Sequence, residues 1–353
     1  MADNKATSKA QEFKALSKKD QQRKIGDLIL NNAMYIIIAI AIIFITVKQP
    51  KFISLSSIVN IISLTAAKLP IALGIGGCIV LTGTDISAGR VVGLAACISA
   101  SLLTTVFKVF PNITSAMPIP VVLLIVLGVG AAVGFVNGFS VAKFKLHPFI
   151  VTLSTQLITY GIILMYLMNG VNNGQTLSGL TDSYRSLITG TLFTIGGVAI
   201  PRYVLYAVIL TAVMWVIWNK TTFGKNMFAV GSNEEAANVS GVNVARTIIL
   251  VFMLAGVMYG ITGFFDGARI ASANANTGLN YECDAIAACV IGGVSFVGGI
   301  GRISGIVVGV LLLQIIFAGL NFLSVDPNML YIIKGLIILV ACAIDMRKYL
   351  VRK

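Results

Sequence analysis

Long apolar segments alternate with short polar connections along almost the whole chain. A helix needs about 20 largely apolar residues to cross a bilayer, and the pattern predicts ten such spans. We place them at 31–47, 58–82, 87–107, 119–142, 148–168, 202–218, 246–270, 284–298, 303–324 and 329–346. The sequence therefore predicts an all-α polytopic membrane protein whose transmembrane domain covers 31–346.

Two parts of this pattern leave alternatives open. The segment at 284–298 is short and contains Gly292, Gly293 and Gly298, so it either crosses the membrane or forms a broken helix buried by its neighbours. The longest outer connection, at 169–201, is either a solvated loop or a platform for a partner.

Composition and charge support a membrane location. Of the 353 residues, 57% are hydrophobic and 11% are charged, whereas soluble domains carry roughly a quarter charged residues. The formal net charge of +13 could suggest nucleic acid, but the basic residues gather in the tails at 1–30 and 347–353 and in short connections. They lack the interleaved aromatic side chains on which bases stack. An excess of Lys and Arg is typical of cytoplasmic segments, so we expect both tails to be cytoplasmic and no nucleic-acid partner.

A polar connection at 219–246 separates two long apolar segments. Ser232 followed by Glu235 forms a capping-box pattern, in which each side chain bonds the other's backbone N–H. Gly241 can supply the left-handed residue that ends a helix. The pattern predicts one helix of about two turns between these residues, with Ala237 on its small apolar face. Such a helix suits docking into a cleft of another protein, and the alternative is an ordinary connector between two spans.

A second polar stretch runs Gly-Thr-Asp-Ile-Ser-Ala-Gly-Arg at 83–90. Gly83 and Gly89 interrupt helices, and Ser87 can cap the helix that follows. Asp85 near a helix start is favoured by the helix dipole. From the residues alone, this stretch is a structured turn.

Charged residues within spans are costly and usually face a cavity or a partner. Lys68 lies in the middle of a predicted span, and we favour an interior structural contact over a substrate contact. Asp266 and Arg269 are three residues apart on a predicted helix and can pair on one face. We expect this pair to hold helices together.

Catalytic and metal-binding patterns are absent from the sequence. The single histidine, His147, cannot build a His-rich metal site, and the five cysteines show no CxxC spacing. There is also no G-x-x-x-x-G-K-[ST] phosphate loop. We therefore expect no catalytic residues and no metal site, which disfavours an integral-membrane enzyme.

Both polar stretches resemble parts of a known family. The connection at 219–246 resembles the coupling loop of ABC-importer permeases that share the vitamin-B12-importer (type II) transmembrane fold. The stretch at 83–90 resembles the signature of the ribose, xylose and galactose class of sugar permeases, and its variants are closest to the galactose/methyl-galactoside branch. Further similar segments lie at 147–150, 219–226 and 284–296. The resemblance extends from about residue 31 to the end of the chain.

The resemblance implies the permease subunit of an ATP-driven importer of a monosaccharide in a bacterial inner membrane. It implies a homodimer in membrane lipid, a cytoplasmic ATPase subunit with two nucleotide sites, and a sugar-binding protein on the outer face. ATP and Mg would bind the ATPase, and this chain would hold no cofactor. The alternative is a gradient-driven secondary sugar transporter.

The resemblance also implies roles for individual residues. Those that contact the ATPase would be Gly231, Ser232, Asn233, Glu234, Glu235, Ala236, Ala237 and Gly241. The family signature would comprise Gly83, Thr84, Asp85, Ser87, Gly89 and Arg90. Candidates for the sugar path are Lys68, Asn274 and Asn276, and the two amides belong equally well to a solvated outer loop.

Overall fold

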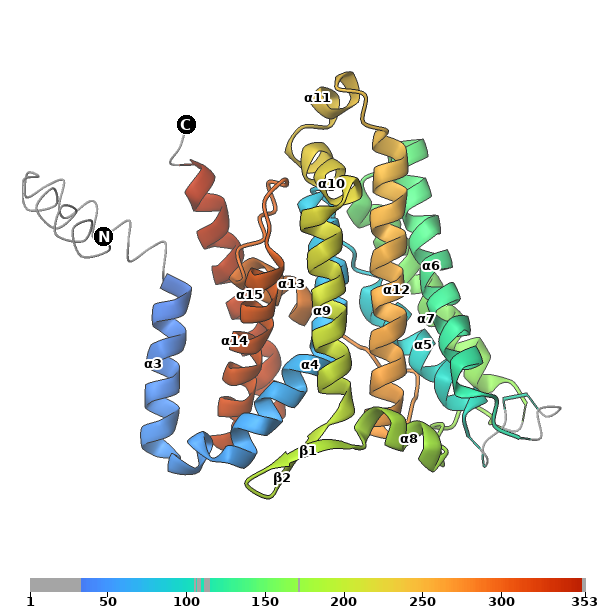
Figure 1. The fold of residues 1–353 in the computed structure, drawn as a ribbon, viewed down its shortest axis with the longest axis vertical. Coiled ribbons are helices and arrows are strands. Elements are labelled where there is room, and N and C mark those ends of the chain that lie inside the picture. Colours follow the sequence, from blue (N-terminus) through green and yellow to red (C-terminus); the bar gives the residue numbers. More distant parts are fainter. Residues whose placement is uncertain (1–32, 105, 107–108, 111–114, 171, 351–353) are drawn as a thin grey trace, which may run out of the picture.

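The computed structural model describes residues 33–104, 106, 109–110, 115–170 and 172–350. The tail predicted at 1–30 lies outside these residues, as does the end of the tail predicted at 347–353. Most helices run along one common direction, with their connections gathered at two opposite ends (Figure 1).

The elements in chain order are mostly helices. They are α3 (Ala33–Lys48), the 3-10 helix η1 (Pro50–Ile53), α4 (Leu55–Val80), α5 (Ala88–Leu102), α6 (Ile119–Phe144), α7 (Pro148–Met168), α8 (Asp182–Thr189), β1 (Thr191–Ile195), β2 (Val198–Pro201), α9 (Arg202–Lys220), α10 (Thr222–Ser232), α11 (Glu234–Val239), α12 (Val244–Ile270), α13 (Tyr281–Ile291), α14 (Ile303–Phe322) and α15 (Pro327–Leu350).

Six helices within the described residues are long and apolar enough to cross a membrane. They are α4, α6, α7, α9, α12 and α14, and each corresponds to a predicted span. The helices α3 and α15 cover two further predicted spans, and both have one end directed toward the end of the molecule that carries α10 and α11 (Figure 1). The prediction of a helical, multi-pass membrane protein is thus confirmed, while the count of ten spans stays a prediction.

The segment at 284–298, which we counted as a span with a broken helix as the alternative, does not form one long helix. The helix α13 has 11 residues, which at 1.5 Å per residue is about 16 Å, roughly half of the hydrocarbon thickness. It ends at Ile291, and the chain then turns back on itself where the Ser295 amide donates to the Ile300 carbonyl at 3.1 Å. The glycines at 292–299 supply this turn, since Gly293 and Gly298 have φ of +83° and +89°. Of the two alternatives, the segment is the broken, buried helix.

The segment predicted as a span at 87–107 is also shorter than expected. The helix α5 ends at Leu102 and nearly all of its 15 residues are buried. It is therefore an interior helix, enclosed by its neighbours.

The centre of the molecule is α12, which packs most extensively against α6, α5 and α4. Its approach to α6 is close because two glycines face each other. A Cβ atom added to Gly130 would lie 2.1 Å from the Gly256 carbonyl oxygen, and one added to Gly256 would lie 2.0 Å from the Gly130 oxygen. Small residues permit such backbone contact between membrane helices.

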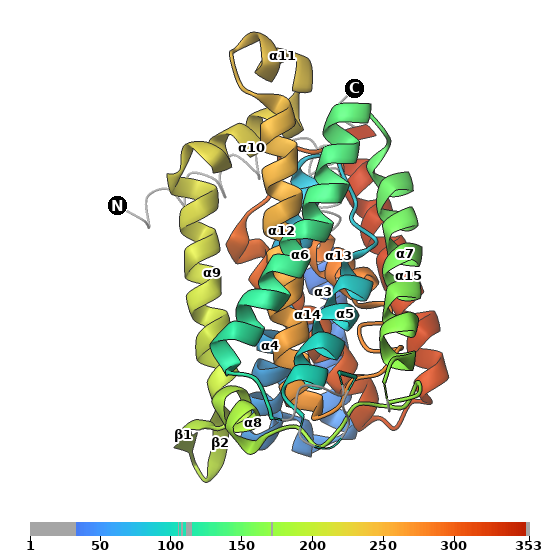
Figure 2. The ribbon, with the colours of Figure 1, turned by 90° about the vertical axis from the view of Figure 1, so that its right-hand side faces the viewer.

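The connection at 169–201, for which we left open a solvated loop or a platform for a partner, is structured. It contains α8 and the antiparallel hairpin of β1 and β2, at the end opposite to α10 and α11 (Figures 1 and 2). The helix α8 is held by Tyr184, which is fully buried and donates from its hydroxyl to the Phe264 carbonyl at 2.5 Å. The sequence does carry a signal for α8 that we missed. Tyr184 and Ile188 are four residues apart, the spacing of one face of a helix, and they form the buried side of α8.

Candidate functional site

The helix α10 lies at the end of α9, and α11 extends beyond the end of α12, at one end of the molecule (Figures 1 and 2). The Thr221 side chain begins α10 by accepting from the Gly224 amide at 3.1 Å. On α10, Met227 and Val230 are buried. At Gly231 the backbone touches the end of α4, because a Cβ atom there would lie 1.9 Å from the Val80 carbonyl oxygen. These contacts of α10 anchor the pair of helices α10 and α11 to the rest of the protein.

The cap of the outermost helix differs from the prediction. Asn233 is the N-cap of α11 and accepts from the Ala236 amide at 2.9 Å. Ser232 ends α10 instead, and its hydroxyl donates to the Phe228 carbonyl at 2.8 Å. The helix predicted between Ser232 and Gly241 is therefore α11, which begins one residue later than expected, and a separate helix, α10, precedes it. The predicted stop is confirmed, since Gly241 has a φ of +83°.

The surface of α11 combines one apolar side chain with carboxylates. Val239 is 89% exposed, an unusual degree for a valine in a rigid, capped helix. Glu234 and Glu235 are exposed in the first turn. Ala237, however, is 4% exposed and packs into the protein's own core. Of the contacts expected on α11, Glu234 and Glu235 are thus exposed, whereas Ala237 is buried within this chain.

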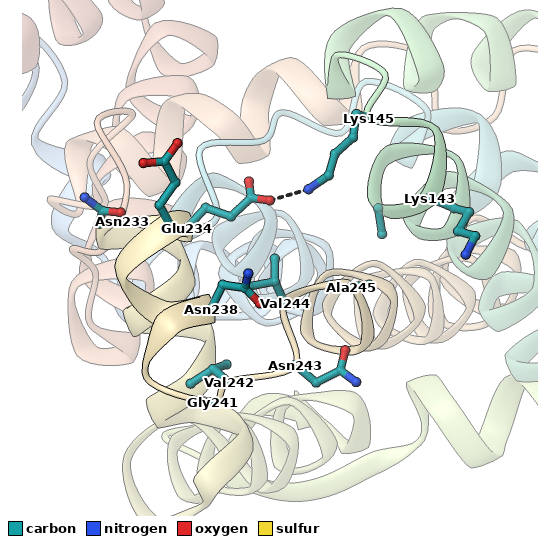
Figure 3. A pocket seen from close by; sticks show the side chains of 12 residues that line it. Lys143, Lys145, Asn233, Glu234, Asn238, Gly241, Val242, Asn243, Val244 and Ala245 are labelled. Atoms are coloured by element: carbon teal, nitrogen blue, oxygen red, sulfur yellow. Dashed lines mark hydrogen bonds and ion pairs between the residues drawn. The ribbon is translucent and has the colours of Figure 1, made fainter.

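A wide groove of about 1110 Å³ lies beside α11 (Figure 3). One wall is α11 and the start of α12, and the other is the end of α6, with Lys143 in its last turn and Lys145 directly after it. Lys145 forms an ion pair with Glu234 across the groove (Figure 3). Both side chains are exposed, so the pair adds little stability, but it joins segments 89 residues apart.

The stretch at 83–90 forms a buried polar cluster rather than a surface loop. Asp85 is fully buried and accepts from the Ser87 amide at 3.0 Å and from its hydroxyl at 2.6 Å. Its other oxygen accepts from the Tyr259 hydroxyl at 3.2 Å. The Asn137 amide donates to the Ser87 hydroxyl, and Thr155 donates to Asn137. The cluster thus ties α6, α7 and α12 to the start of α5. Ser87 does not cap α5 with its side chain, contrary to prediction.

The rest of this stretch is equally enclosed. The Thr84 carbonyl accepts from the Thr152 hydroxyl at 3.1 Å, and the Gly83 amide donates to the Cys78 carbonyl at 2.9 Å. Arg90 donates to the Ala275 carbonyl at 3.0 Å. These contacts fix the connection between α4 and α5.

Gly89 and Arg90 face α13 and α7. A Cβ atom on Gly89 would lie 2.0 Å from the carboxylate of Glu282, which is buried. The guanidinium of Arg90 lies over the ring of Tyr160, 4.1 Å from its centroid. Both residues therefore serve close packing around α5.

The charged residues within the spans form pairs. Arg269 Nε lies 2.8 Å from Asp266 Oδ1, which confirms the predicted pair. Lys334 on α15 lies 3.0 Å from the Asp284 carboxylate. Lys68 places its ammonium over the ring of Tyr281 and lines a small cavity with it. This contact agrees with the interior structural role that we favoured for Lys68.

The two asparagines proposed for the sugar path lie in the connection between α12 and α13. Both are exposed. The Asn274 side chain accepts from the Asn276 amide at 2.8 Å, so it shapes its own turn. No hydrogen bond joins either residue to Lys68 among the described residues, and their role in a path stays a prediction. In the same described part of the chain, no group of three or more His, Cys, Asp and Glu could hold a metal ion.

Sequence reasoning missed several of these residues. Val239 belongs to the small apolar face of the predicted helix, with Ala236 and Ala237, but no local signal shows that Val239 is exposed while Ala237 is buried. Thr155 and Tyr259 could have been found as polar residues inside predicted spans. Their partners in the cluster are far apart in sequence, and only the fold brings them together.

Helices of membrane-spanning length, joined at one end by the two-helix element α10 and α11, define a multi-pass membrane protein. Residues 57–342 match the family described as "Branched-chain amino acid transport system / permease component". The chain therefore belongs to this family of transport-system permeases.

Its curated relatives are sugar-import permeases. The galactose/methyl galactoside import permease protein MglC of Haemophilus influenzae is 43% identical over 94% of this chain and 99% of its own length. The MglC protein of Salmonella typhimurium is 44% identical over 91% of this chain and 95% of its own length. The ribose import permease protein RbsC of Haemophilus influenzae is 34% identical over 91% of this chain and 95% of its own length. No solved structure matches the chain significantly. The predicted resemblance to ribose- and galactose-class permeases is confirmed, and the chain is a permease component rather than an enzyme.

Proposed function

We propose that this chain is the membrane subunit of an ATP-driven importer of galactose or methyl galactoside. It forms the sugar path and receives mechanical work from a separate ATPase. The cargo is proposed because the relatives of 43–44% identity are named as galactose/methyl galactoside import permeases. The observation that carries the ATPase role is the exposed, firmly anchored element formed by α10 and α11.

The proposed assembly contains two copies of this chain and two kinds of partner. An ATPase subunit with two nucleotide sites binds ATP and Mg and docks on α11, at the cytoplasmic end. A sugar-binding protein docks at the opposite end, where α8 and the hairpin of β1 and β2 provide a structured surface. Both tails of the chain are cytoplasmic, in keeping with their basic residues, and the complex lies in the bacterial inner membrane.

Force applied to α11 would reach the spans through backbone contacts at one point. The Val80 carbonyl at the end of α4 accepts from the Gly299 amide at 2.8 Å and also touches Gly231. The C-terminal end of α10, the end of α4 and the turn after α13 therefore meet there. When the ATPase dimer closes on ATP, it would pull α11 and shift these elements together.

The pairing of Asp266 and Asp284 disfavours a gradient-driven transporter that would use these two carboxylates. Proton-coupled transporters use carboxylates that gain and lose protons within the membrane. Asp266 and Asp284 are each held by a cation, Arg269 and Lys334. This arrangement is typical of structural ion pairs.

Replacement of Val239 by Asp tests the docking surface. Loss of an apolar contact of this size and addition of a charge should weaken ATPase binding by at least about tenfold. The tagged chain is purified from native membranes in mild detergent, and the associated ATPase is identified by mass spectrometry and by ATP hydrolysis. The control Val239→Ile keeps the apolar contact and should retain the ATPase. Equal recovery of the ATPase with both variants would exclude α11 as the docking site.

A further inference from the structure

The short, buried helices α5 and α13 begin next to each other inside the molecule. Gly89 lies in the first turn of α5, and Gly278 lies just before α13. A Cβ atom added to Gly278 would lie 2.1 Å from the Gly89 carbonyl oxygen, so the two backbones are in contact. From this contact α5 runs toward α8, where the Leu103 carbonyl accepts from the Thr181 amide at 3.0 Å. The helix α13 runs the opposite way, toward the turn that meets the end of α4. The starts of both helices therefore lie between the two ends of the molecule (Figure 1).

Glu282 brings a carboxylate to this contact. It lies in the first turn of α13 and is 3% exposed. A Cβ atom on Gly89 would lie 2.0 Å from Glu282 Oε2, and no hydrogen-bond donor reaches this oxygen from any residue that the structure describes. The other carboxylates that are buried in the same part of the chain, Asp85, Asp266 and Asp284, each have a donor or a cation. Because burial removes water from Glu282 Oε2 and no donor replaces it, this arrangement is unfavourable.

Arg90 places a cation beside the same contact. It follows Gly89 in α5 and is largely buried. Its guanidinium donates to the Ala275 carbonyl at 3.0 Å and lies over the ring of Tyr160. Both of these partners are neutral, and Arg90 forms no ion pair with any residue in the described part of the chain. Two opposite charges thus lie in the first turns of neighbouring helices, and they are not paired with each other.

The helix α13 is joined closely to α14 and, through the turn that follows it, to α10. A Cβ atom on Gly292 would lie 2.2 Å from the Gly305 carbonyl oxygen, and one on Gly305 would lie 2.1 Å from the Gly292 oxygen. In the turn, a Cβ atom on Gly298 would lie 2.3 Å from the carbonyl oxygen of Gly231, at the C-terminal end of α10. Such backbone contacts leave no space for side chains to yield. Movement of this end of α10 would therefore carry α13 with it.

A shift of α13 relative to α5 would change the partner of Arg90. Ala275 and Glu282 belong to the same segment, seven positions apart, so both move past Arg90 when this segment moves. A guanidinium binds a carboxylate more strongly than it binds a neutral carbonyl, because both partners are charged and two parallel hydrogen bonds can form. Exchange of Ala275 for Glu282 would give both buried charges a partner.

We propose that Glu282 is a positioning residue for transport, whose carboxylate pairs with Arg90 in the state that follows the movement of α10. The proposal rests on the proposed function, in which an ATPase moves α10 and α11, and deepens it. The ion pair stabilises the shifted position of α13, and the loss of the Ala275 hydrogen bond frees the segment between α12 and α13. The structure described here is the state before this exchange.

Thermal stability and transport together test this role. Glu282→Gln keeps the shape of the side chain but removes its charge. Without nucleotide, the Tm of the complex in detergent should stay the same or rise, because a buried charge that lacks a donor is removed. Galactose uptake per ATP hydrolysed, in proteoliposomes with the ATPase and the binding protein, should fall by about tenfold or more, the effect of losing a charged hydrogen bond in one state only.

Asp284→Asn is the matched control for stability. It lies two residues away on α13 and removes a carboxylate that is already paired with Lys334, so its Tm should fall. A role of Glu282 in stability alone would lower the Tm of Glu282→Gln in the same way. That result, or normal uptake with Glu282→Gln, would overturn the proposal.

A double-mutant cycle tests whether Arg90 is the partner. Arg90→Gln should lower uptake per ATP about as much as Glu282→Gln, and the variant with both changes should be no worse than either alone. Losses that multiply, to about a hundredfold, would mean that the two residues act independently and would contradict the pairing. If the parental complex moves no galactose with ATP, the proposed function fails and the inference falls with it. If the parental complex transports galactose and the losses multiply, only the inference is wrong.

Discussion

At the scale of single residues, Asp85 shows how a short polar sequence organises a membrane protein. The carboxylate is fully buried and accepts three hydrogen bonds, two from Ser87 and one from Tyr259. A buried charge is tolerated only when such donors replace the water that it has lost. Ser87 is a local donor, two residues from Asp85, whereas Tyr259 lies on the distant helix α12. The full compensation for burying Asp85 therefore exists only in the folded arrangement.

Replacement of Tyr259 by Phe should therefore destabilise the protein. The change removes a donor to a buried carboxylate, which costs about 1.5–3 kcal/mol. Tyr206→Phe is the matched control, because its hydroxyl donates to the Leu187 carbonyl at an exposed site, and we expect an effect within about 0.5 kcal/mol. Thermal unfolding in detergent compares the two variants. Equal shifts in Tm would mean that the Asp85 cluster does not stabilise the fold.

The cap of α11 shows the limit of local prediction for single residues. Ser232 and Asn233 are both good N-cap residues, and the sequence favoured Ser232 because Glu235 completes a capping box. In the structure, Gly231 packs on the Val80 carbonyl and keeps Ser232 within α10. The cap then moves one residue on, to Asn233. Packing against a distant helix decided between two equivalent local choices.

At the scale of elements, close packing of α6 on α12 yields a prediction with an internal control. Gly130→Ala should cost about 1–3 kcal/mol, as overpacking usually does, because its Cβ atom would overlap the Gly256 carbonyl. Gly128→Ala, two residues away on the same helix, meets nothing within 4 Å and should be neutral or slightly stabilising, since Ala is the better helix former. Thermal stability in detergent distinguishes them, and similar Tm values would contradict the observed helix crossing.

The helices that span the membrane could be predicted because their pattern is long and continuous. Six of the predicted spans correspond to helices of spanning length. The interior helices α5 and α13 could not be sized in this way, because a buried short helix is as apolar as a span. A high hydropathy shows that a segment avoids water, but it does not show whether lipid or other parts of the protein surround the segment.

The candidate site was only partly predictable at this scale. The polar connection at 219–246 and the polar stretch at 83–90 could be predicted because each interrupts the apolar pattern of the chain. Their contacts were not, since Lys145 meets Glu234 and Asp85 meets Tyr259 across 89 and 174 residues. The helix α8 and the strands after it were also missed, because each is too short to leave a strong period.

At the scale of the whole molecule, the account predicts which end faces which compartment. Asn238→Cys near the tip of α11 should be labelled by a membrane-impermeant thiol reagent only after the cells are permeabilised. Thr194→Cys, on the exposed strand β1 at the opposite end, should be labelled once the outer membrane is opened. Both positions are exposed, so accessibility within the protein does not limit the reaction. Labelling of Asn238→Cys in cells with an intact inner membrane would invert the proposed topology.

The central claim is that α11 transmits the work of an ATPase to a sugar path, and sugar uptake by the reconstituted complex tests it most directly. Proteoliposomes with this chain, its ATPase and the binding protein are supplied with radiolabelled galactose and with ATP on the ATPase side. We predict ATP-dependent accumulation that Val239→Asp abolishes and Val239→Ile preserves. Galactose uptake that proceeds without ATP, or that Val239→Asp leaves unchanged, would contradict the account.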